Sequence, residues 1–184
     1  KQLHGPLYAL INSDYSFKRT KLKKRSAKIK RVLIYFGNGE ETFKLLKTTL
    51  IAFSSQDLLK MKLDIVFNGK FNDLKKLRRL TTKRDKTQIY TNLPNLSSLM
   101  SKADLAIGSG GVNTGERIYL GLPSITISFA ENHNILLQDL EKNGYVFHLG
   151  EHNNVKVESI IEKVVDIKNN INLSKENKKI MSLA

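Results

Sequence analysis

The sequence contains no cysteine, which excludes a disulfide framework and any metal site built on thiolates. No apolar run approaches the roughly 20 residues that a membrane-spanning helix needs, and no signal peptide opens the chain. Walker A, H-E-x-x-H and G-x-S-x-G motifs are also absent. No Asp-x-Asp pair is present to hold a divalent cation. We therefore expect neither a metal nor a cofactor.

What the chain does contain is enough apolar material for one compact domain. It has 184 residues, 40% of them hydrophobic, which is ordinary for a folded protein and too much for a disordered tail. The chain begins at Lys1 rather than Met, so we expect it to be part of a longer protein with a neighbouring domain.

Acidic residues are scarce, and the formal net charge is +14. Nine basic residues and no acid lie between Lys18 and Arg31, and eight more basic residues lie between Lys70 and Lys86. Neither stretch interleaves aromatic residues as a base-stacking surface does. We therefore favour solvated basic faces and expect no specific nucleic-acid partner, although a non-enzymatic basic binding module stays open as an alternative.

Strand and helix patterns alternate from residue 31 onward. Apolar runs closed by glycine or polar residues predict strands, and apolar residues at helical spacing predict the segments between them. The predicted strands are 32–36, 63–67, 88–90, 105–107, 124–128 and 145–149, and the predicted helices are 42–59, 71–80, 96–103, 114–120, 136–143, 157–167 and a last one after Ser174. This alternation predicts a doubly wound α/β domain with a parallel sheet over residues 31–184, preceded by an entry segment and basic linker over residues 1–30.

Two glycine-rich turns follow predicted strands, where ligands bind in such sheets. The stronger, Gly108-Ser-Gly-Gly-Val-Asn-Thr-Gly-Glu116, runs from a strand directly into a helix, whose free N–H groups favour phosphate and which Asn113 or Thr114 would cap. From the residues alone, a simple tight turn with Glu116 answering the helix dipole is the favoured alternative. The spacing is not that of the dinucleotide G-x-G-x-x-G fingerprint. The second turn, Gly37-Asn38-Gly39, is weaker still.

A third polar element, Glu131-Asn132-His133-Asn134, is expected to lie before a helix and to line the mouth of a pocket. One histidine without a spaced acid or nucleophile is not a catalytic constellation. His148 and His152 are four residues apart, but His148 lies in a predicted strand, so a metal site is not expected there. The residues alone therefore support a phosphate- or nucleotide-binding half-site.

A resemblance extends this interpretation. The segments GPLYALI, VLIYFGNG and LPNLSSLMSKADLAIGSGGVNTGERIYLGLPSITISFAENHN resemble the C-terminal domain of the UDP-2,4-diacetamido-2,4,6-trideoxy-β-L-altropyranose hydrolase family of pseudaminic acid biosynthesis, also seen in spore-coat and flagellin polysaccharide proteins. That family is similar to the lipid-II-forming N-acetylglucosaminyltransferase, and both have the two-domain GT-B fold with Rossmann-like halves. The resemblance spans about residues 5–149, and its motifs do not separate hydrolase from transferase.

The resemblance implies a UDP site in this chain. The diphosphate would be held by Gly110, Gly111, Val112, Asn113 and Thr114 and approached by Gly37, Asn38 and Gly39; Glu116 would accept hydrogen bonds from the ribose hydroxyls, the backbone near Leu93 would contact the uracil edge, and Glu131, Asn132 and His133 would face the diphosphate or sugar. Family members usually have Gly-Gly-Ser/Thr-Asp where this chain has Gly37-Asn38-Gly39-Glu40, and Gln in place of His133. Both departures lie near the sugar and bear on its identity.

The resemblance also implies a reaction. The intact protein would be a cytoplasmic enzyme that hydrolyses the sugar–phosphate linkage of a UDP-sugar and releases UDP. The family's catalytic histidine lies in an N-terminal domain that this chain lacks, so the catalytic residues are expected there and the chain alone is expected to bind UDP weakly and hydrolyse nothing. A UDP-sugar-dependent GT-B glycosyltransferase or an epimerase is the alternative.

Overall fold

The protein is built around a six-stranded parallel sheet. The structure, a computed structural model, describes residues 11–82 and 84–183, with the backbone alone for Phe71, Asn132 and Leu183. The strands are β1 (Arg31–Tyr35), β2 (Lys62–Val66), β3 (Thr87–Tyr90), β4 (Leu105–Ser109), β5 (Ser124–Ser128) and β6 (Phe147–Glu151). Their order is β3-β2-β1-β4-β5-β6, which is the order of the Rossmann fold, and every pairing is parallel. The predicted fold class, a doubly wound α/β sheet, is confirmed.

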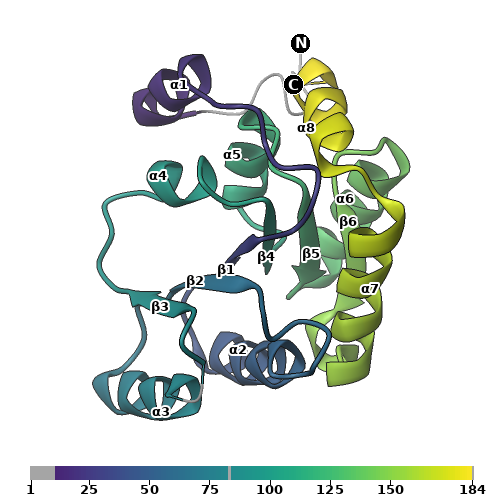
Figure 1. Ribbon diagram of the computed structural model, residues 1–184. Coiled ribbons are helices and arrows are strands. Elements are labelled where there is room, and N and C mark those ends of the chain that lie inside the picture. Colours follow the sequence, from purple (N-terminus) through teal and green to yellow (C-terminus); the bar gives the residue numbers. More distant parts are fainter. Residues whose placement is uncertain (1–10, 83, 184) are drawn as a thin grey trace.

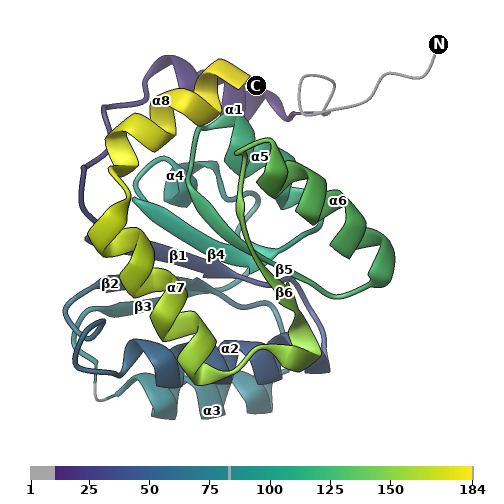
Figure 2. The same cartoon turned by 90° about the vertical axis from the view of Figure 1, so that its right-hand side faces the viewer.

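Helices cover both faces of this sheet (Figures 1 and 2). One face carries α2 (Glu40–Phe53), α3 (Phe71–Thr81) and α7 (Val157–Asn170), while the other carries α1 (Ser13–Thr20), α4 (Ser97–Met100), α5 (Asn113–Tyr119) and α6 (Glu131–Lys142). The C-terminal α8 (Leu173–Leu183) packs against α5, and a 3-10 turn spans His152–Asn154. The crossovers from β1 to β3 therefore run over one face of the sheet, and those from β3 to β6 run over the other.

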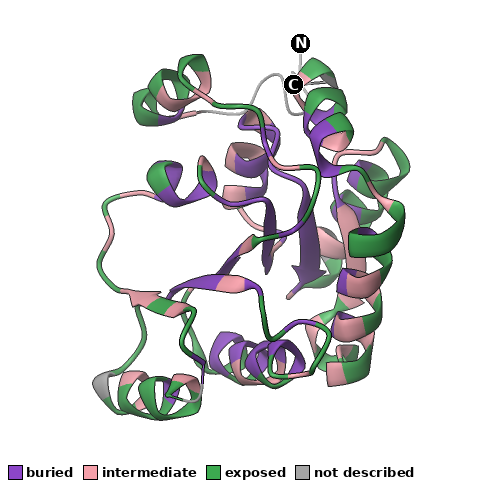
Figure 3. Cartoon of the chain, in the orientation of Figure 1, coloured by how far each residue is buried: buried purple, intermediate pink, exposed green. Residues whose placement is uncertain are grey.

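The two faces of the central strands are buried in different cores. Val32 and Ile34 of β1 join the core beneath α2 and α7, while Leu33 joins the core beneath α4. This follows from the period of two along a strand, and it explains why the apolar runs in the sequence are continuous. Figure 3 shows the buried residues concentrated on the sheet and on the inner faces of the helices.

The order of the strands reverses between β1 and β4, the point at which ligands bind in open α/β sheets. Tyr35 of β1 lies opposite Gly108 of β4, so the loops that follow these two strands leave the sheet side by side. The two glycine-rich turns of the sequence are those two loops.

Two predicted element boundaries are wrong at functionally relevant places. Helix α6 begins at Glu131 rather than at residue 136, because its polar first turn carries no apolar periodicity to reveal it. The four polar residues expected before this helix are its first turn. Helix α1 lies within the predicted entry segment, for which no helix was predicted. The first ten residues of that segment, which include most of an apolar stretch at residues 7–11, lie outside the described part of the chain.

The expectation that the basic stretches are solvated faces is wrong for two of their arginines, which are buried. The buried Arg25 donates to the carbonyls of Ala103 and Leu120, and burial lowers the pKa of its guanidinium to about 10 against the opposing charge of Asp104. The buried Arg84 donates to the carbonyls of Phe53, Leu59 and Met61. These arginines satisfy backbone carbonyls inside the fold, a role that composition cannot distinguish from surface charge.

Helix α1 is joined to the domain by Arg19 and Tyr15. The Arg19 guanidinium lies 4.6 Å from the centre of the Tyr119 ring and donates to the carbonyls of Tyr119 and Met181. Tyr15 is fully buried. None of the helices in the described ranges 11–82 and 84–183 has the length and apolar character to cross a bilayer.

Candidate functional site

A small cavity of about 240 Å³ opens at the carboxyl edge of the sheet, on the side of α4 and α5. It collects residues from α1, from the ends of β1 and β2, from the loop after β3 and from α5. The residues that matter most for its chemistry are Tyr15, Tyr35, Asn68, Leu93, Asn113 and Glu116. Three of the predicted site residues, Leu93, Asn113 and Glu116, are thus brought together by elements far apart in the sequence.

Of the described residues that line this cavity, Glu116 is the one with a carboxylate. Its Oε2 is buried and has no hydrogen-bond partner among the residues that the structure describes. Burial raises the pKa of the Glu116 carboxyl, and the hydrogen bond with Tyr15 and the charge of Arg117 only partly offset this. An acceptor oxygen left without a donor inside a cavity is costly to the fold. The arrangement is suited to a ligand that brings hydroxyl donors.

Two tyrosines stand beside this carboxylate. The Tyr15 hydroxyl oxygen accepts a hydrogen bond from the N–H of Leu96 at 3.2 Å. The pKa of Tyr15 is raised by burial and then by Glu116, and the pKa of Tyr35 is raised by the same two causes. Both phenols therefore stay neutral at physiological pH and remain available as hydrogen-bonding walls of the cavity.

The backbone of Leu93 is also open to a ligand. Within the described part of the chain, neither its N–H nor its C=O takes part in a hydrogen bond with another residue, whereas the preceding N–H of Asn92 donates to Asn68 Oδ1 at 2.8 Å. A free donor and a free acceptor on one residue match the edge of a planar base.

The stronger glycine turn is held from below by a buried arginine. Arg117 is completely desolvated, and its Nη2 donates to the Ser109 carbonyl at 2.7 Å and to Thr114 Oγ1 at 2.8 Å. Burial lowers the pKa of its guanidinium to about 10, against the opposing charge of Glu116. A Cβ on Gly108 would lie 2.5 Å from Arg117 Nη1 and 2.6 Å from the Tyr35 carbonyl oxygen. The glycine thus lets the arginine and the neighbouring strand approach the turn.

Three consecutive backbone N–H groups in this turn have no acceptor. Among the described residues, those of Gly111, Val112 and Asn113 donate no hydrogen bond, while the N–H groups of Thr114 and Gly115 are used within the turn. The expected cap is wrong: Val112 stands at the N-cap of α5 and no side chain caps it, because the Thr114 hydroxyl bonds Ser109 and Arg117 instead. Unused amides in a row form a concavity that suits an anion.

The weaker glycine turn runs beside the stronger one. Gly37 and Gly39 have φ of 88° and 132°, in the region that favours glycine. Gly39 also lines a second, larger cavity on the opposite face of the sheet, between α2 and α3. None of the three residues of this turn lines the small cavity, so the turn lies at the same edge of the sheet as that cavity without forming part of its wall.

The third predicted element lies at the end of β5, one strand further along the edge. Glu131, Asn132 and His133 form the first turn of α6, with the side chain of Asn132 outside the described part. The Oδ1 of the next residue, Asn134, lies 2.7 Å from His148 Nε2 and accepts from it in the tautomer that carries the proton on Nε2, and Asn134 Nδ2 donates to Glu151 Oε1 at 3.2 Å. These bonds fix the start of α6 against β6. In the part of the chain that the structure describes, no group of three or more His, Cys, Asp and Glu could hold a metal ion.

Sequence reasoning missed most of the cavity wall. Asn68, Pro94 and Asn95 follow strand ends, and that position was a usable signal. Asn12, Tyr15 and Tyr35 carry no local signal, since α1 reaches the site only through the tertiary packing of a segment about 100 residues away from Glu116.

The raised pKa of Glu116 predicts how its replacement changes stability. A carboxyl whose pKa is higher in the folded state than its unfolded value of about 4.3 binds its proton more tightly in the folded state. The free energy of unfolding therefore falls as pH rises from the unfolded-state pKa through the folded-state pKa. The variant Glu116→Gln lacks this penalty. In urea unfolding between pH 4 and pH 7, we expect its free energy of unfolding to gain on that of the wild type as pH rises. If the free energy of unfolding of Glu116→Gln minus that of the wild type stays constant or falls as pH rises, the raised pKa of Glu116 is contradicted.

The sequence and the fold were compared with those of known proteins. The profile of the glycosyltransferase family 28 C-terminal domain matches residues 39–183. An uncharacterized protein of Methanocaldococcus jannaschii is 30% identical over 129 residues, 67% of this chain and 26% of that protein. The spore coat polysaccharide biosynthesis protein SpsG of Bacillus subtilis is 21% identical over 145 residues, 79% of this chain and 40% of that protein. The chain thus spans well under half the length of these relatives.

A solved structure shows the same architecture. The crystal structure of Acinetobacter baumannii MurG superposes with a TM-score of 0.66 at 17% identity, over 92% of this chain and 49% of that one. At this identity the likeness concerns the fold.

Proposed function

The chain belongs to the glycosyltransferase family 28 C-terminal domain family, and from that premise we propose that it is the UDP-sugar-binding half of a two-domain GT-B enzyme. The observation that carries the proposal is the unpaired, buried Oε2 of Glu116 in a cavity that Asn113 also lines, Asn113 being the last of three consecutive residues with free amides. The Glu116 carboxylate can accept hydrogen bonds from hydroxyl groups of a ligand, and the free backbone N–H groups can donate to an anion. A nucleoside diphosphate supplies both in one molecule.

The nucleoside is proposed to occupy the small cavity. The ribose hydroxyls donate to the Glu116 carboxylate, and the uracil edge pairs with the free backbone N–H and C=O of Leu93. Tyr15 and Tyr35 wall this space. A purine is larger and presents a different edge, so we expect the cavity of about 240 Å³ to prefer the pyrimidine.

The diphosphate is proposed to lie over the turn formed by Gly110, Gly111, Val112, Asn113 and Thr114, with Gly37, Asn38 and Gly39 approaching from the next strand. Preorganised N–H donors stabilise charge that develops on a leaving diphosphate. The first turn of α6, with Glu131, Asn132 and His133, then faces the diphosphate or the sugar.

For the reaction, we propose hydrolysis of the linkage between the sugar and the diphosphate, releasing UDP and a free diacetamido-trideoxy sugar in cytoplasmic synthesis of a surface polysaccharide or flagellin glycan. The similarity to a spore coat polysaccharide biosynthesis protein supports that setting. The water is activated by a residue of an N-terminal domain outside this chain. A second candidate, transfer of the sugar to an acceptor, is favoured by the match to a glycosyltransferase family.

Gly111→Ala tests the placement of the diphosphate. A Cβ at Gly111 meets only Ser109 Oγ at 3.9 Å, and the residue has no left-handed φ, so we expect the melting temperature to stay the same. The added methyl group occupies the approach to the free amides, so UDP affinity should fall roughly tenfold, about 1.4 kcal/mol. Calorimetric titration measures this. Unchanged affinity for UDP would place the diphosphate elsewhere.

The reaction is tested on the full-length enzyme. Release of UDP from a UDP-sugar without any acceptor supports hydrolysis, and release only when an acceptor is added supports transfer. The chain by itself is expected to turn over neither substrate, and measurable turnover by residues 1–184 alone would overturn the assignment of the catalytic residue to another domain.

A further inference from the structure

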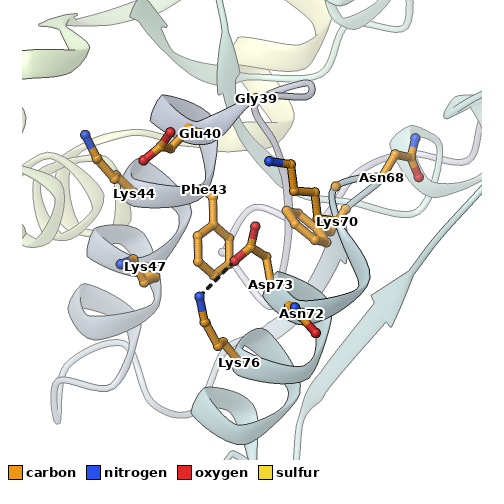
Figure 4. Close-up of a pocket in the computed structure, with 12 residues that line it drawn as sticks. Gly39, Glu40, Phe43, Lys44, Lys47, Asn68, Lys70, Asn72, Asp73 and Lys76 are labelled. Carbon is orange, nitrogen blue, oxygen red and sulfur yellow. Dashed lines mark hydrogen bonds and ion pairs between the residues drawn. The ribbon is translucent and has the colours of Figure 1, made fainter.

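A second cavity, larger than the proposed nucleotide site, lies away from that site. It has a volume of about 800 Å³ and sits between α2 and α3, beneath the carboxyl ends of β1 and β2 (Figure 4). Asn68 lines both this cavity and the small one, so the end of β2 separates them. The role proposed for the small cavity leaves the larger one without a function.

The walls of this cavity carry more positive than negative charge. Four lysines line it, against two acids, Glu40 and Asp73; the lysines are Lys44, Lys47, Lys70 and Lys76. Lys44 and Lys47 lie on α2, Lys76 lies on α3 and Lys70 is the residue just before α3, so the four converge through the packing of α2 against α3 and not from one basic run of sequence.

Two of the four lysines are already neutralised. Lys44 Nζ lies 2.8 Å from Glu41 Oε1, and Lys76 Nζ lies 3.2 Å from Asp73 Oδ1. In Figure 4 the second of these pairs is the dashed line beside Phe43. These ammonium groups contribute little net attraction to a ligand.

Lys47 and Lys70 are different. Among residues 11–82 and 84–183, no carboxylate lies within ion-pair distance of either ammonium group. Lys47 Nζ lies 5.2 Å from the centre of the Phe43 ring, and Lys70 is exposed at the start of α3, reaching toward α2 in Figure 4. Two uncompensated cations thus face one cavity from opposite walls.

Two aromatic residues, Phe43 and Phe67, contribute to the lining of the cavity. The rings of Phe43 and Phe67 are buried, with centroids 5.6 Å apart at 49°. Because these rings are buried, they offer no face on which a nucleic-acid base could stack, so a nucleic-acid strand is a poor fit. The space above them suits an organic group attached to an anion.

We propose that the cavity between α2 and α3 binds a phosphate-bearing ligand, with Lys47 and Lys70 as its phosphate contacts. An ammonium group binds phosphate as a point charge, and two of them offset the negative charge of a phosphate ester. The volume of about 800 Å³ leaves room for the group that the phosphate carries. The proposal stands whether or not the small cavity binds UDP.

The test uses the isotope-labelled chain and inorganic pyrophosphate as the probe. We expect saturable NMR shifts in residues 40–47 and 68–76, and at least tenfold weaker binding at these residues in the variant Lys47→Gln/Lys70→Gln. Both substitutions lie at the surface of the cavity and replace an ammonium group by a neutral polar amide on a side chain one atom shorter, so folding should be unaffected. Raising the salt concentration should weaken binding in the wild type.

A matched variant controls for the high overall charge. Lys60→Gln/Lys86→Gln removes the same charge at exposed positions before β2 and β3, at the opposite edge of the sheet, and should bind pyrophosphate at α2 and α3 as the wild type does. Equal weakening in both variants, or no saturable shifts at α2 and α3, would overturn the proposal. Glu116→Gln should leave these shifts unchanged, which keeps this test separate from that of the nucleotide site.

Two further arms identify the source of the phosphate. Shifts at α2 and α3 with glucose 1-phosphate, and no sedimentation with vesicles, would support a soluble phosphate ester. Sedimentation with phosphatidylglycerol vesicles but not with phosphatidylcholine vesicles, lost in Lys47→Gln/Lys70→Gln, would support a lipid headgroup. If neither probe depends on Lys47 and Lys70, the proposal is overturned.

Discussion

Glu116→Gln is expected to lower the affinity of the chain for UDP by about 10- to 100-fold. The carboxylate accepts from two ribose hydroxyls in the proposed complex, and charge-assisted hydrogen bonds contribute about 1.5–3 kcal/mol each. An amide keeps one acceptor and turns an N–H group toward the other hydroxyl. Calorimetric titration of the wild type and the variant measures the loss.

The stability of this variant separates a binding defect from a folding defect. Because Glu116 Oε2 is buried without a partner, its replacement should not destabilise the unliganded fold. Glu158→Gln, an exposed acid in the first turn of α7, is the matched control and should bind UDP as the wild type does. Equal affinities of Glu116→Gln and the wild type for UDP would contradict the placement of the ribose at the Glu116 carboxylate.

Gly108→Ala is expected to destabilise the protein by about 2–3 kcal/mol, within the range for overpacking a well-packed interior. The new Cβ would lie 2.6 Å from the Tyr35 carbonyl oxygen, a backbone atom of the adjacent strand, and 2.5 Å from Arg117 Nη1. Backbone in a central strand cannot yield as a side-chain tip does. For a chain of this length, the melting temperature should fall by roughly 5–10 °C.

Gly111→Ala, three residues along the same turn, is the control for this effect because its Cβ enters open space. Thermal unfolding followed by circular dichroism compares the two variants. A Gly108→Ala variant that melts with the wild type would mean that β1 and β4 separate easily at the turn, and would contradict a rigid arginine-supported loop.

The sequence predicted the fold well because the central strands are buried on both faces. The run Val32-Leu33-Ile34 has no polar interruption, and glycine-rich turns mark the ends of β1 and β4. The doubly wound parallel sheet and both glycine turns followed from that signal. The start of α6 did not, because its first turn is polar and faces the edge of the sheet.

The candidate site was predictable only in the parts that lie on local motifs. Glu116 and the glycine turn share one strand–turn–helix unit, so their proximity is local. Tyr15 approaches the same cavity from α1, and no pattern in residues 13–20 indicates that contact. The larger cavity was missed for a related reason. In the sequence, the lysines of α2 and α3 are indistinguishable from ordinary surface charge, and only the packing of the two helices brings them to one cavity.

The most direct test of the central claim is calorimetric titration of the unmodified chain with UDP and, separately, with AMP. We expect saturable binding of one UDP per chain and at least tenfold weaker binding of AMP, because the cavity at Glu116 and Leu93 has a volume of only about 240 Å³ and a purine is larger than a pyrimidine. No binding of UDP, or equal binding of the two nucleotides, would contradict a uridine-nucleotide half-site in this chain.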